Sequence, residues 1–382
     1  MRKVHVGLGK RSYDIFVGRR SLPDLGQHCR RLGLGPRCAI LTDDRVGPRY
    51  GAATSRLLRQ AGFDPVVITV PAGERAKCVR QLALVYDQLA AHRLERKSFI
   101  LALGGGVVGD LAGFAAATYL RGIPFVQVPT TLVGQVDSSV GGKTGVNLSG
   151  GKNLVGAFWQ PRLVVCDLEI LRTLPDREFR SGLAEVIKYG LICDIEFFNW
   201  LEANMASLVA GDQQCLARAI YRSCEIKAEV VARCCVIKAE VVGRDETESG
   251  LRAILNFGHT IGHALEAITR YGQYLHGEAI AIGQVLAARL SHRLLDLPGS
   301  EVQRIERLFQ AAGLPVGVRL SERQRERLLT AMRLDKKVAG GQSRFVLAER
   351  IGRARFGEVV PASVLDAVLM EISESSRGTQ PG

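Results

Sequence analysis

The chain has 382 residues, of which 47% are hydrophobic and 23% are charged, and its net charge is +13. This length and composition are ordinary for a soluble globular protein with a large core and two domains. No apolar run approaches the length that a membrane-spanning helix needs. Nucleic-acid binding is possible on charge alone, but aromatic residues are only 6%, and a small anionic ligand suits the diffuse positive charge equally well.

The cysteines and the N-terminus indicate a reducing compartment. Nine cysteines occur without CxxC spacing, and the opening MRKVHVGLGK lacks the apolar segment of a signal peptide. We therefore expect reduced thiols and a cytoplasmic location.

Residues 36–130 alternate short apolar runs with amphipathic segments, a pattern typical of parallel βαβ units. Strands are predicted at 38–43, 66–70, 98–103 and 124–129, and a further strand at 163–167. The strand at 98–103 runs directly into GGGVVGD (104–110) and a helix, an arrangement that lets backbone N–H groups approach a phosphate. The spacing is not GxGxxG, so a tight structural turn stays open as an alternative.

The segment TTLVGQVDSSVGGKTGVNLSGGKNLVGAF (130–158) contains two GGK units, which place Lys143 and Lys152 in a glycine-rich loop. A P-loop would need glycine where Asp137 stands, so a nucleotide triphosphatase is disfavoured. Two cations in a close-approach loop favour a bound anion such as a phosphate monoester, with solvated lysines as the alternative.

From residue 181 onward the pattern is mainly helical, with a short strand pair expected at 343–352. If residues 248–266 form one helix, five polar side chains fall on a single stripe: Glu248, Arg252, Asn256, His259 and His263. Such a stripe is a poor core face, and three of the seven histidines lie within 248–276. These residues alone leave the presence and the absence of a metal site equally plausible. A zinc protease is not supported, because Thr260 stands directly after the first histidine, where that motif has a glutamate.

Six segments in sequence order resemble the 3-dehydroquinate synthase family. They are GGGVVGDLAGFAAATYLRGI, VPTTLVGQVDSSVGGKTGVN, GGKNLVGAF, SGLAEVIKYG, LRAILNFGHTIGHALE and LHGEA. The resemblance implies an α/β N-terminal Rossmann-like domain with a parallel sheet, a mostly α-helical C-terminal domain and an active site in the interdomain cleft. The boundary is expected near Pro175, after the strand at 163–167, which gives domains at 1–175 and 176–372, and the polar residues 373–382 are expected to be a disordered tail.

The resemblance also implies the reaction and its cofactors. Members of this family convert 3-deoxy-D-arabino-heptulosonate 7-phosphate to 3-dehydroquinate and phosphate, the second step of the shikimate pathway. They do so by transient NAD oxidation, phosphate β-elimination, re-reduction and intramolecular aldol closure, with one divalent metal (Zn²⁺ or Co²⁺). The implied enzyme is an NAD- and metal-dependent phosphorus–oxygen lyase, a homodimer in the cytoplasm with no nucleic-acid or membrane partner. The native metal, and whether phosphate serves as its own base, stay open.

The family's functional residues carry over onto matching positions here. Metal ligands are implied at Glu185, His259 and His276, whereas spacing alone would have paired His259 with His263. NAD contacts are implied at Asp44, Gly73, Glu74, Lys77, Gly106, Val107, Val108, Gly109, Asp110, Thr130, Thr131, Lys143, Lys152, Ile170, Leu171, Arg172 and Thr173. Substrate contacts and catalytic roles are implied at Asp137, Lys143, Lys152, Asn153, Lys188, Lys238, Arg252, Asn256, His263, Lys336 or Lys337, and Arg121, the last reaching a neighbouring subunit.

A tandem repeat departs from the family pattern. EIKAEVVARCC (225–235) is followed at once by VIKAEVVGRDE (236–246), where the family has one unit. Eleven residues make about three helical turns, so a helix can absorb the repeat and become about 16 Å longer. Lys238 keeps the family's spacing to His259 and Lys227 keeps the upstream spacing. We predict that Lys238 is the site residue, and whether the lengthened helix is tolerated stays open.

Two alternatives differ in function. A related sugar-phosphate cyclase or a metal-dependent polyol dehydrogenase would share the architecture, although a dehydrogenase does not need the phosphate-binding lysines and Arg121. An inactive or nucleic-acid-binding scaffold is the second alternative. Release of phosphate from the heptulosonate phosphate, without net NADH, separates the predicted synthase from both alternatives.

Overall fold

The computed structural model describes the backbone of residues 1–240, 251–269, 273–333, 338–339 and 342–375, with the side chains of 234–240 among those not described. Two compact units divide the chain. The first comprises Met1–Pro175 and Leu216–Ala232, and the second comprises Asp176–Cys215 and Arg233–Gly382. The first unit therefore includes residues 216–232, which were predicted to belong to the second domain at 176–372.

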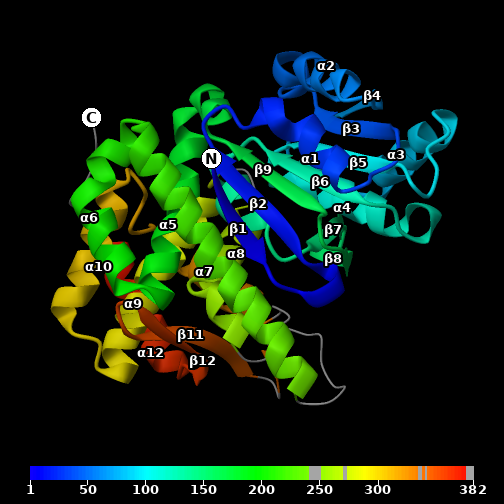
Figure 1. Cartoon of the computed structure of the whole chain (residues 1–382). Coiled ribbons are helices and arrows are strands. Elements are labelled where there is room, and N and C mark those ends of the chain that lie inside the picture. The colour runs from blue at the N-terminus through cyan, green and yellow to red at the C-terminus, as the bar shows by residue number, and fades with distance from the viewer. Residues whose placement is uncertain (241–250, 270–272, 334–337, 340–341, 376–382) are drawn as a thin grey trace. The chain divides into compact units, whose positions relative to one another are not determined.

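The first unit contains a seven-stranded sheet in the order β1-β2-β9-β6-β5-β3-β4, parallel except for β1 (Figure 1). Its strands are β1 (Arg2–Val6), β2 (Tyr13–Gly18), β3 (Arg37–Asp43), β4 (Asp64–Val70), β5 (Phe99–Gly104), β6 (Phe125–Pro129) and β9 (Leu163–Asp167). The predicted strands at 38–43, 66–70, 98–103, 124–129 and 163–167 are confirmed within one or two residues.

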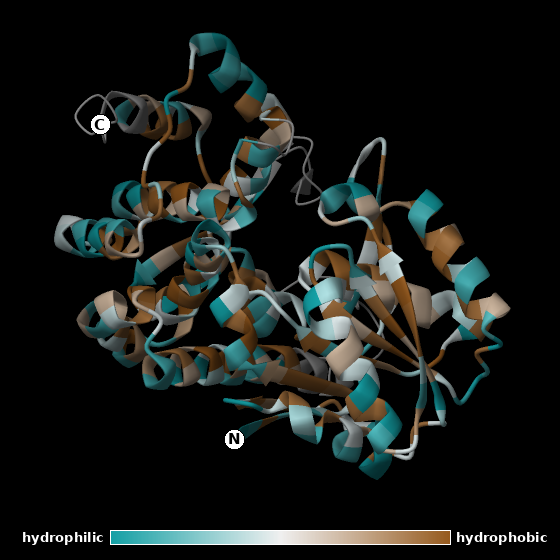
Figure 2. Ribbon diagram, turned by 90° about the horizontal axis from the view of Figure 1, so that it is seen from above, coloured by the Kyte–Doolittle hydropathy of each residue, from teal (hydrophilic) through white to brown (hydrophobic). Residues whose placement is uncertain are grey.

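Helices cover both faces of this sheet because its strands are apolar on both sides. Ala39 and Leu41 of β3 pack with α3 (Val79–Ala91) and α4 (Gly106–Thr118). The intervening Cys38 and Ile40 pack on the other face with α1 (Leu25–Arg31) and α2 (Ala52–Gln60). In Figure 2 the strands of the sheet are accordingly coloured brown over much of their length.

A separate antiparallel hairpin, β7 (Lys143–Leu148) with β8 (Gly151–Phe158), packs on α4 through β7. The glycine-rich segment is thus paired strand rather than the loop expected from its sequence. Gly145 and Gly156 face each other across the pair, and a Cβ on Gly156 would lie 2.1 Å from the Thr144 carbonyl oxygen. These two glycines therefore permit the close approach of the two strands.

The second unit is built mainly of helices. They are α5 (Asp176–Cys193), α6 (Ile195–Val209), α8 (His259–Ile268), α9 (His276–Leu295), α10 (Gly299–Ala311), α11 (Glu322–Arg333) and α12 (Ala362–Ser375). The apolar helix α9 is central, with α5, α8, α10, α12 and β11 packed against it. The strand pair expected within 343–352 is formed instead by β11 (Gln342–Arg350), which fills most of that range, and β12 (Arg353–Val359), which lies beyond it.

The 28-residue helix α7 (Gln213–Glu240) carries the first copy of the repeat and the start of the second. Within the first copy, Ile226, Ala228 and Val231 are buried. Residues 376–382 of the expected tail lie outside the described residues, whereas 373–375 are helical. None of the helices described here is long and apolar enough to cross a membrane.

Candidate active site

A buried ion pair lies in the middle of α5. Glu185 and Lys188 are three residues apart, so both side chains project from one face of the helix. They form an ion pair, and the residues are 0% and 1% exposed. A charged pair withdrawn from water this completely costs desolvation energy, which favours a functional reason for its presence.

The two candidate histidine ligands each begin a helix: His259 is the first residue of α8 and His276 the first of α9. The single helix expected over 248–266 is wrong for the described residues, because a 3₁₀ helix (Leu251–Asn256) ends before Phe257 and α8 starts after Gly258. Gly258 has φ +77°, and a Cβ there would lie 2.5 Å from the Gln284 backbone nitrogen. Close packing against α9 therefore requires this turn to contain glycine.

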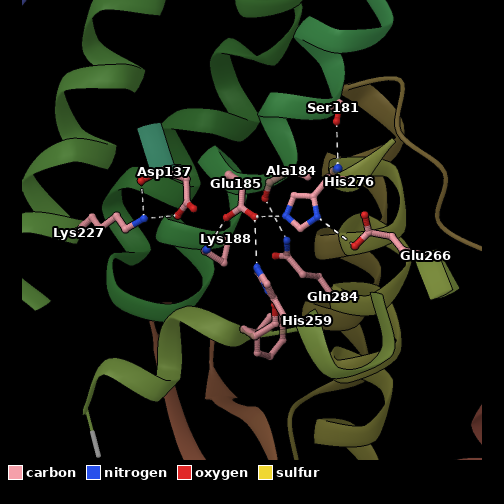
Figure 3. A network of polar contacts seen from close by, with 12 residues as sticks. Asp137, Ser181, Ala184, Glu185, Lys188, Lys227, His259, Glu266, His276 and Gln284 are labelled. Carbon is pink, nitrogen blue, oxygen red and sulfur yellow. Dashed lines mark hydrogen bonds and ion pairs between the residues drawn. The ribbon is translucent and has the colours of Figure 1, made fainter. Parts of the chain in front are cut away.

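Glu185, His259 and His276 converge on one point, as the close-up shows (Figure 3). Nε2 of His259 lies 3.4 Å from Glu185 Oε1, and Nε2 of His276 lies 3.5 Å from the same oxygen. A tetrahedral zinc site with bonds of about 2.1 Å separates its ligand atoms by about 3.4 Å. The spacing thus suits a shared divalent cation, which all three residues are chemically able to bind.

Hydrogen bonding and charge support the same interpretation. His259 Nδ1 lies 3.1 Å from the Phe257 carbonyl oxygen, so donation there leaves the Nε2 lone pair directed at the site. Neither oxygen of Glu185 accepts a well-formed hydrogen bond from the described residues, although both are buried. A buried carboxylate that pairs with Lys188 on one oxygen and faces an imidazole lone pair with the other fits a metal cation, because two acceptors facing each other need a cation between them.

The pKa shifts set the protonation states that a metal ligand set needs. Burial would raise the pKa of Glu185, but Lys188 and the two imidazoles hold it well below its usual range, so the carboxylate is ionised. Burial lowers the pKa of His259 and favours its neutral ring. Burial opposes the charged form of His276 too, but Glu185 and Glu266 raise its pKa to about 10. Without a metal, His276 is thus protonated on both ring nitrogens, with Nε2 facing Glu185 and Nδ1 facing Glu266.

Several implied NAD residues of the first unit follow the carboxyl ends of β3 and β5, where the strand order reverses. The chain passes from β3 outward to β4 and then returns to β5 on the other side of β3. Open α/β sheets bind ligands at the carboxyl ends of strands beside such a switch point. Asp44 follows the end of β3, and Gly106 follows the end of β5 and starts α4.

The start of α4 is suited to an anion. Its N-cap, Gly105, supplies no side-chain hydrogen bond to the first-turn N–H groups, which keeps those donors directed outward from the helix. Val107 and Val108 follow in the first turn, and Gly109 packs so tightly that a Cβ would lie 2.8 Å from Gln127 Oε1. The structural alternative therefore holds for Gly109 and also for Gly105, where a Cβ would lie 2.9 Å from Thr131 Cγ2, while Gly106 stays a candidate for a phosphate contact.

Other implied NAD residues are tied into local networks. Lys77 Nζ lies 2.5 Å from Asp110 Oδ2. Burial raises the pKa of Asp110 and Lys77 lowers it, and the effect of burial is the larger, so the pKa is raised. Glu74 accepts a hydrogen bond from Asn147, 2.8 Å away, and lies 3.8 Å from Lys152 Nζ. The remaining members follow strands or lie in the 3₁₀ helix Leu168–Thr173: Asp44, Gly73, Thr130, Thr131, Ile170, Leu171, Arg172 and Thr173.

The implied substrate residues divide between the units. In the first, Lys143 opens β7, Lys152 and Asn153 open β8, Asp137 lies in a π-helical turn (Gly134–Ser138), and Arg121 is exposed after α4. In the second, His263 follows His259 by one helical turn, Lys188 pairs with Glu185, and Arg252 and Asn256 occupy the 3₁₀ helix before α8. Lys336, Lys337 and the side chain of Lys238 lie outside the described residues.

Two residues in contact with implied site residues were not predicted as site residues: Glu266 was overlooked, and Lys227 was ranked behind Lys238. Glu266 lies beside His276, and its position seven residues after His259 on one helix face could have indicated it. Lys227 donates to both the carbonyl oxygen and Oδ1 of Asp137, at 2.6 and 2.7 Å. Only coordinates could have assigned that partner, since 90 residues separate the two.

Family models and individual relatives agree on what the chain resembles. The 3-dehydroquinate synthase N-terminal family matches residues 67–181, and the C-terminal family matches 182–233 and 228–338. The second match starts again inside the repeat, as expected if the family has a single copy. The 3-dehydroquinate synthase of Nitrosomonas europaea is 51% identical over 356 residues, which cover 93% of this chain and 92% of the relative.

Solved structures have the same fold. The 2-epi-5-epi-valiolone synthase ValA of Streptomyces hygroscopicus subsp. jinggangensis, with NAD⁺ and Zn²⁺ bound, has a TM-score of 0.84 and 30% identity, covering 95% of this chain and 97% of that one. A 2-deoxy-scyllo-inosose synthase complexed with carbaglucose-6-phosphate, NAD⁺ and Co²⁺ has a TM-score of 0.85, covering 97% and 99%; at 24% identity it supports the fold alone.

Proposed function

The chain belongs to the 3-dehydroquinate synthase family, and we propose that Glu185, His259 and His276 hold the divalent metal of that reaction. The enzyme is a lyase of the shikimate pathway that converts 3-deoxy-D-arabino-heptulosonate 7-phosphate to 3-dehydroquinate and phosphate. The observation that carries the metal assignment is the 3.4 and 3.5 Å spacing of the two imidazole nitrogens from one carboxylate oxygen.

When bound, NAD accepts and returns a hydride, and a Zn²⁺ or Co²⁺ ion lowers the pKa of a coordinated substrate hydroxyl. The N-terminus of α4 and the carboxyl end of β3 would hold the nucleotide, through Gly106–Asp110 and Asp44. Glu185, His259 and His276 supply three protein ligand atoms, which would leave a fourth or fifth position for substrate oxygens.

The chain's own charges and proton donors complete the chemistry. Lys188 neutralises Glu185 and presents a cation next to the ligand set, which stabilises developing negative charge. His263, which is exposed one turn after His259, would move protons at the reacting carbons. Lys143, Lys152, Asn153, Arg252, Asn256 and one of Lys336 and Lys337 would hold the substrate's phosphate and carboxylate.

We also propose a homodimer in the cytoplasm. The hairpin β7–β8 exposes Leu148, Leu154, Val155 and Phe158, which are 37% to 43% accessible to solvent. Such a cluster on one two-stranded element is typical of an interaction surface, and a second copy is the occupant that family membership supports. Arg121 would then reach the phosphate pocket of the other subunit.

Phosphate release tests the proposal. The purified protein with NAD should release phosphate from the heptulosonate phosphate without net NADH, lose this activity when a chelator removes the metal, and regain it with Zn²⁺ or Co²⁺. Net NADH formation without phosphate would instead support a polyol dehydrogenase. Absence of both reactions in the metal-loaded protein would support an inactive scaffold.

A further inference from the structure

Both candidate histidine ligands present Nε2 to Glu185, and each has its other ring nitrogen near an acceptor. For His259 that acceptor is the Phe257 carbonyl oxygen, 3.1 Å from Nδ1. For His276 it is Glu266 Oε2, 3.3 Å from Nδ1. Figure 3 shows Glu185 and Glu266 on opposite sides of the His276 ring.

Glu266 is 4% exposed and projects from α8, whereas His276 opens α9. It therefore connects the helix that carries one histidine with the helix that carries the other. A carboxylate accepting from Nδ1–H fixes the tautomer, orients the ring and makes Nε2 a better donor to a cation.

We propose that Glu266 is a positioning residue that holds His276 as a metal ligand. It acts through His276 and contacts neither metal nor substrate. The inference rests on the proposed metal site, because it assigns Nε2 of His276 to the cation. Loss of such an outer-shell partner typically weakens metal binding about 10- to 100-fold.

Glu266→Gln and Glu266→Ala test this through Co²⁺ affinity, measured by competition with a chelator, and through the visible absorption of bound Co²⁺. Both variants should bind Co²⁺ about 10- to 100-fold more weakly, with an altered spectrum. Glu306→Gln is the matched control, since it removes the partner of Arg289, also on α9, thirteen residues after His276. This control should leave Co²⁺ affinity and spectrum unchanged.

Wild-type affinity and spectrum in both Glu266 variants would overturn the positioning role while leaving the metal site standing. Failure of the wild-type protein itself to bind Co²⁺ would instead contradict the proposed metal site. Glu266→Gln keeps the side chain's size, so it separates loss of the carboxylate from loss of folding if Glu266→Ala does not fold.

The repeat supports a second, independent inference. In its first copy, Lys227 is 7% exposed and binds Asp137, an implied substrate residue, and the neighbouring Cys224 Sγ lies 3.3 Å from the Gln135 carbonyl oxygen. All four residues belong to the first unit. The first copy is therefore packed against the turn that presents Asp137.

The backbone of α7 continues helically to Glu240, so Lys238 follows Lys227 on the same helix. Eleven residues displace it by about 16 Å along the axis, which is farther than a lysine side chain can bridge.

We infer that Lys227 of the first copy, rather than Lys238, supplies the family's substrate-contacting lysine beside Asp137. This replaces the preference for Lys238 drawn from its spacing to His259, and it rests on the proposed function. The second copy is then surplus sequence that lengthens α7.

Lys227→Ala should lower kcat/KM for phosphate release about 10- to 100-fold, as expected for loss of a charged hydrogen bond, and Lys238→Ala should leave it near wild type. Deletion of residues 227–237 restores the single unit EIKAEVVGRDE and should keep activity, since one lysine stays at the packed position. Co²⁺ affinity reports folding of the second unit in every variant.

A large loss in Lys238→Ala with little loss in Lys227→Ala would overturn the assignment. If the wild-type protein releases no phosphate, the proposed function fails first. Equal, near-wild-type rates in both single variants would show that neither lysine contacts substrate and would also overturn the inference.

Discussion

Glu185 determines the chemistry of the second unit, because its buried carboxylate meets an ammonium group and two imidazoles. The fully buried Lys188 depends on it for charge compensation. Desolvation of both groups is tolerable only while they stay together. The same carboxylate thus serves the stability of α5 and the proposed cation.

Glu185→Gln should destabilise the metal-free protein by about 3–5 kcal/mol, since it leaves Lys188 buried without its carboxylate. The double variant Glu185→Gln/Lys188→Met should recover most of that loss while still failing to bind metal. Urea unfolding of the chelator-treated proteins measures this. A double variant no more stable than Glu185→Gln would show that the ion pair is not the cause.

Single residues were the hardest part of the site to predict from sequence. The resemblance supplied Glu185, His259 and His276, whereas spacing alone would have paired His259 with His263. Glu266 was overlooked because a glutamate in a helix is most often a solvated residue. Its contact with His276 depends on how α8 and α9 pack, which helical periodicity does not specify.

At the scale of elements, helix starts rather than helix interiors place both histidines. The turn at Phe257–Gly258 directs His259 toward Glu185 and depends on glycine for two reasons. The φ of +77° is unfavourable for other residues, and the Gln284 backbone occupies the position of a Cβ.

Gly258→Ala should therefore destabilise the second unit by several kcal/mol and weaken Co²⁺ binding. Gly211→Ala is its matched control, because Gly211 has φ +79° but nothing within 4 Å of the Cβ position. The control should cost only about 1 kcal/mol, for the strained backbone, and leave the metal affinity unchanged. Thermal unfolding and Co²⁺ titration of both variants make the comparison, and equal effects would contradict the packing argument.

The sequence predicted the parallel strands well, because β3, β4, β5, β6 and β9 are short apolar runs bounded by turn residues. It did not predict the hairpin β7–β8, since glycines that allow close strand pairing resemble those of a loop. Nor did it predict the break before α8, because one continuous polar stripe fits a helix over 248–266. In both places long-range packing, rather than local preference, decides the structure.

At the scale of the whole molecule, the proposed dimer makes a prediction about mixed subunits. If Arg121 acts in the neighbouring subunit's site, Arg121→Ala and His259→Ala subunits should each be inactive alone. Reassembled from a mixture, they should recover about a quarter of wild-type phosphate release, because half of the dimers are mixed and each has one intact site. No recovery in a mixture shown to exchange subunits would place Arg121 in its own subunit's site.

The central claim is that one divalent cation is held by Glu185, His259 and His276. Titration of the metal-free protein with Co²⁺, followed by visible absorption, tests it most directly. We expect about one equivalent to bind tightly with a four- or five-coordinate spectrum, and Glu185→Gln, His259→Ala and His276→Ala each to abolish that signal. Unchanged stoichiometry and spectrum in any one of these variants would contradict the account.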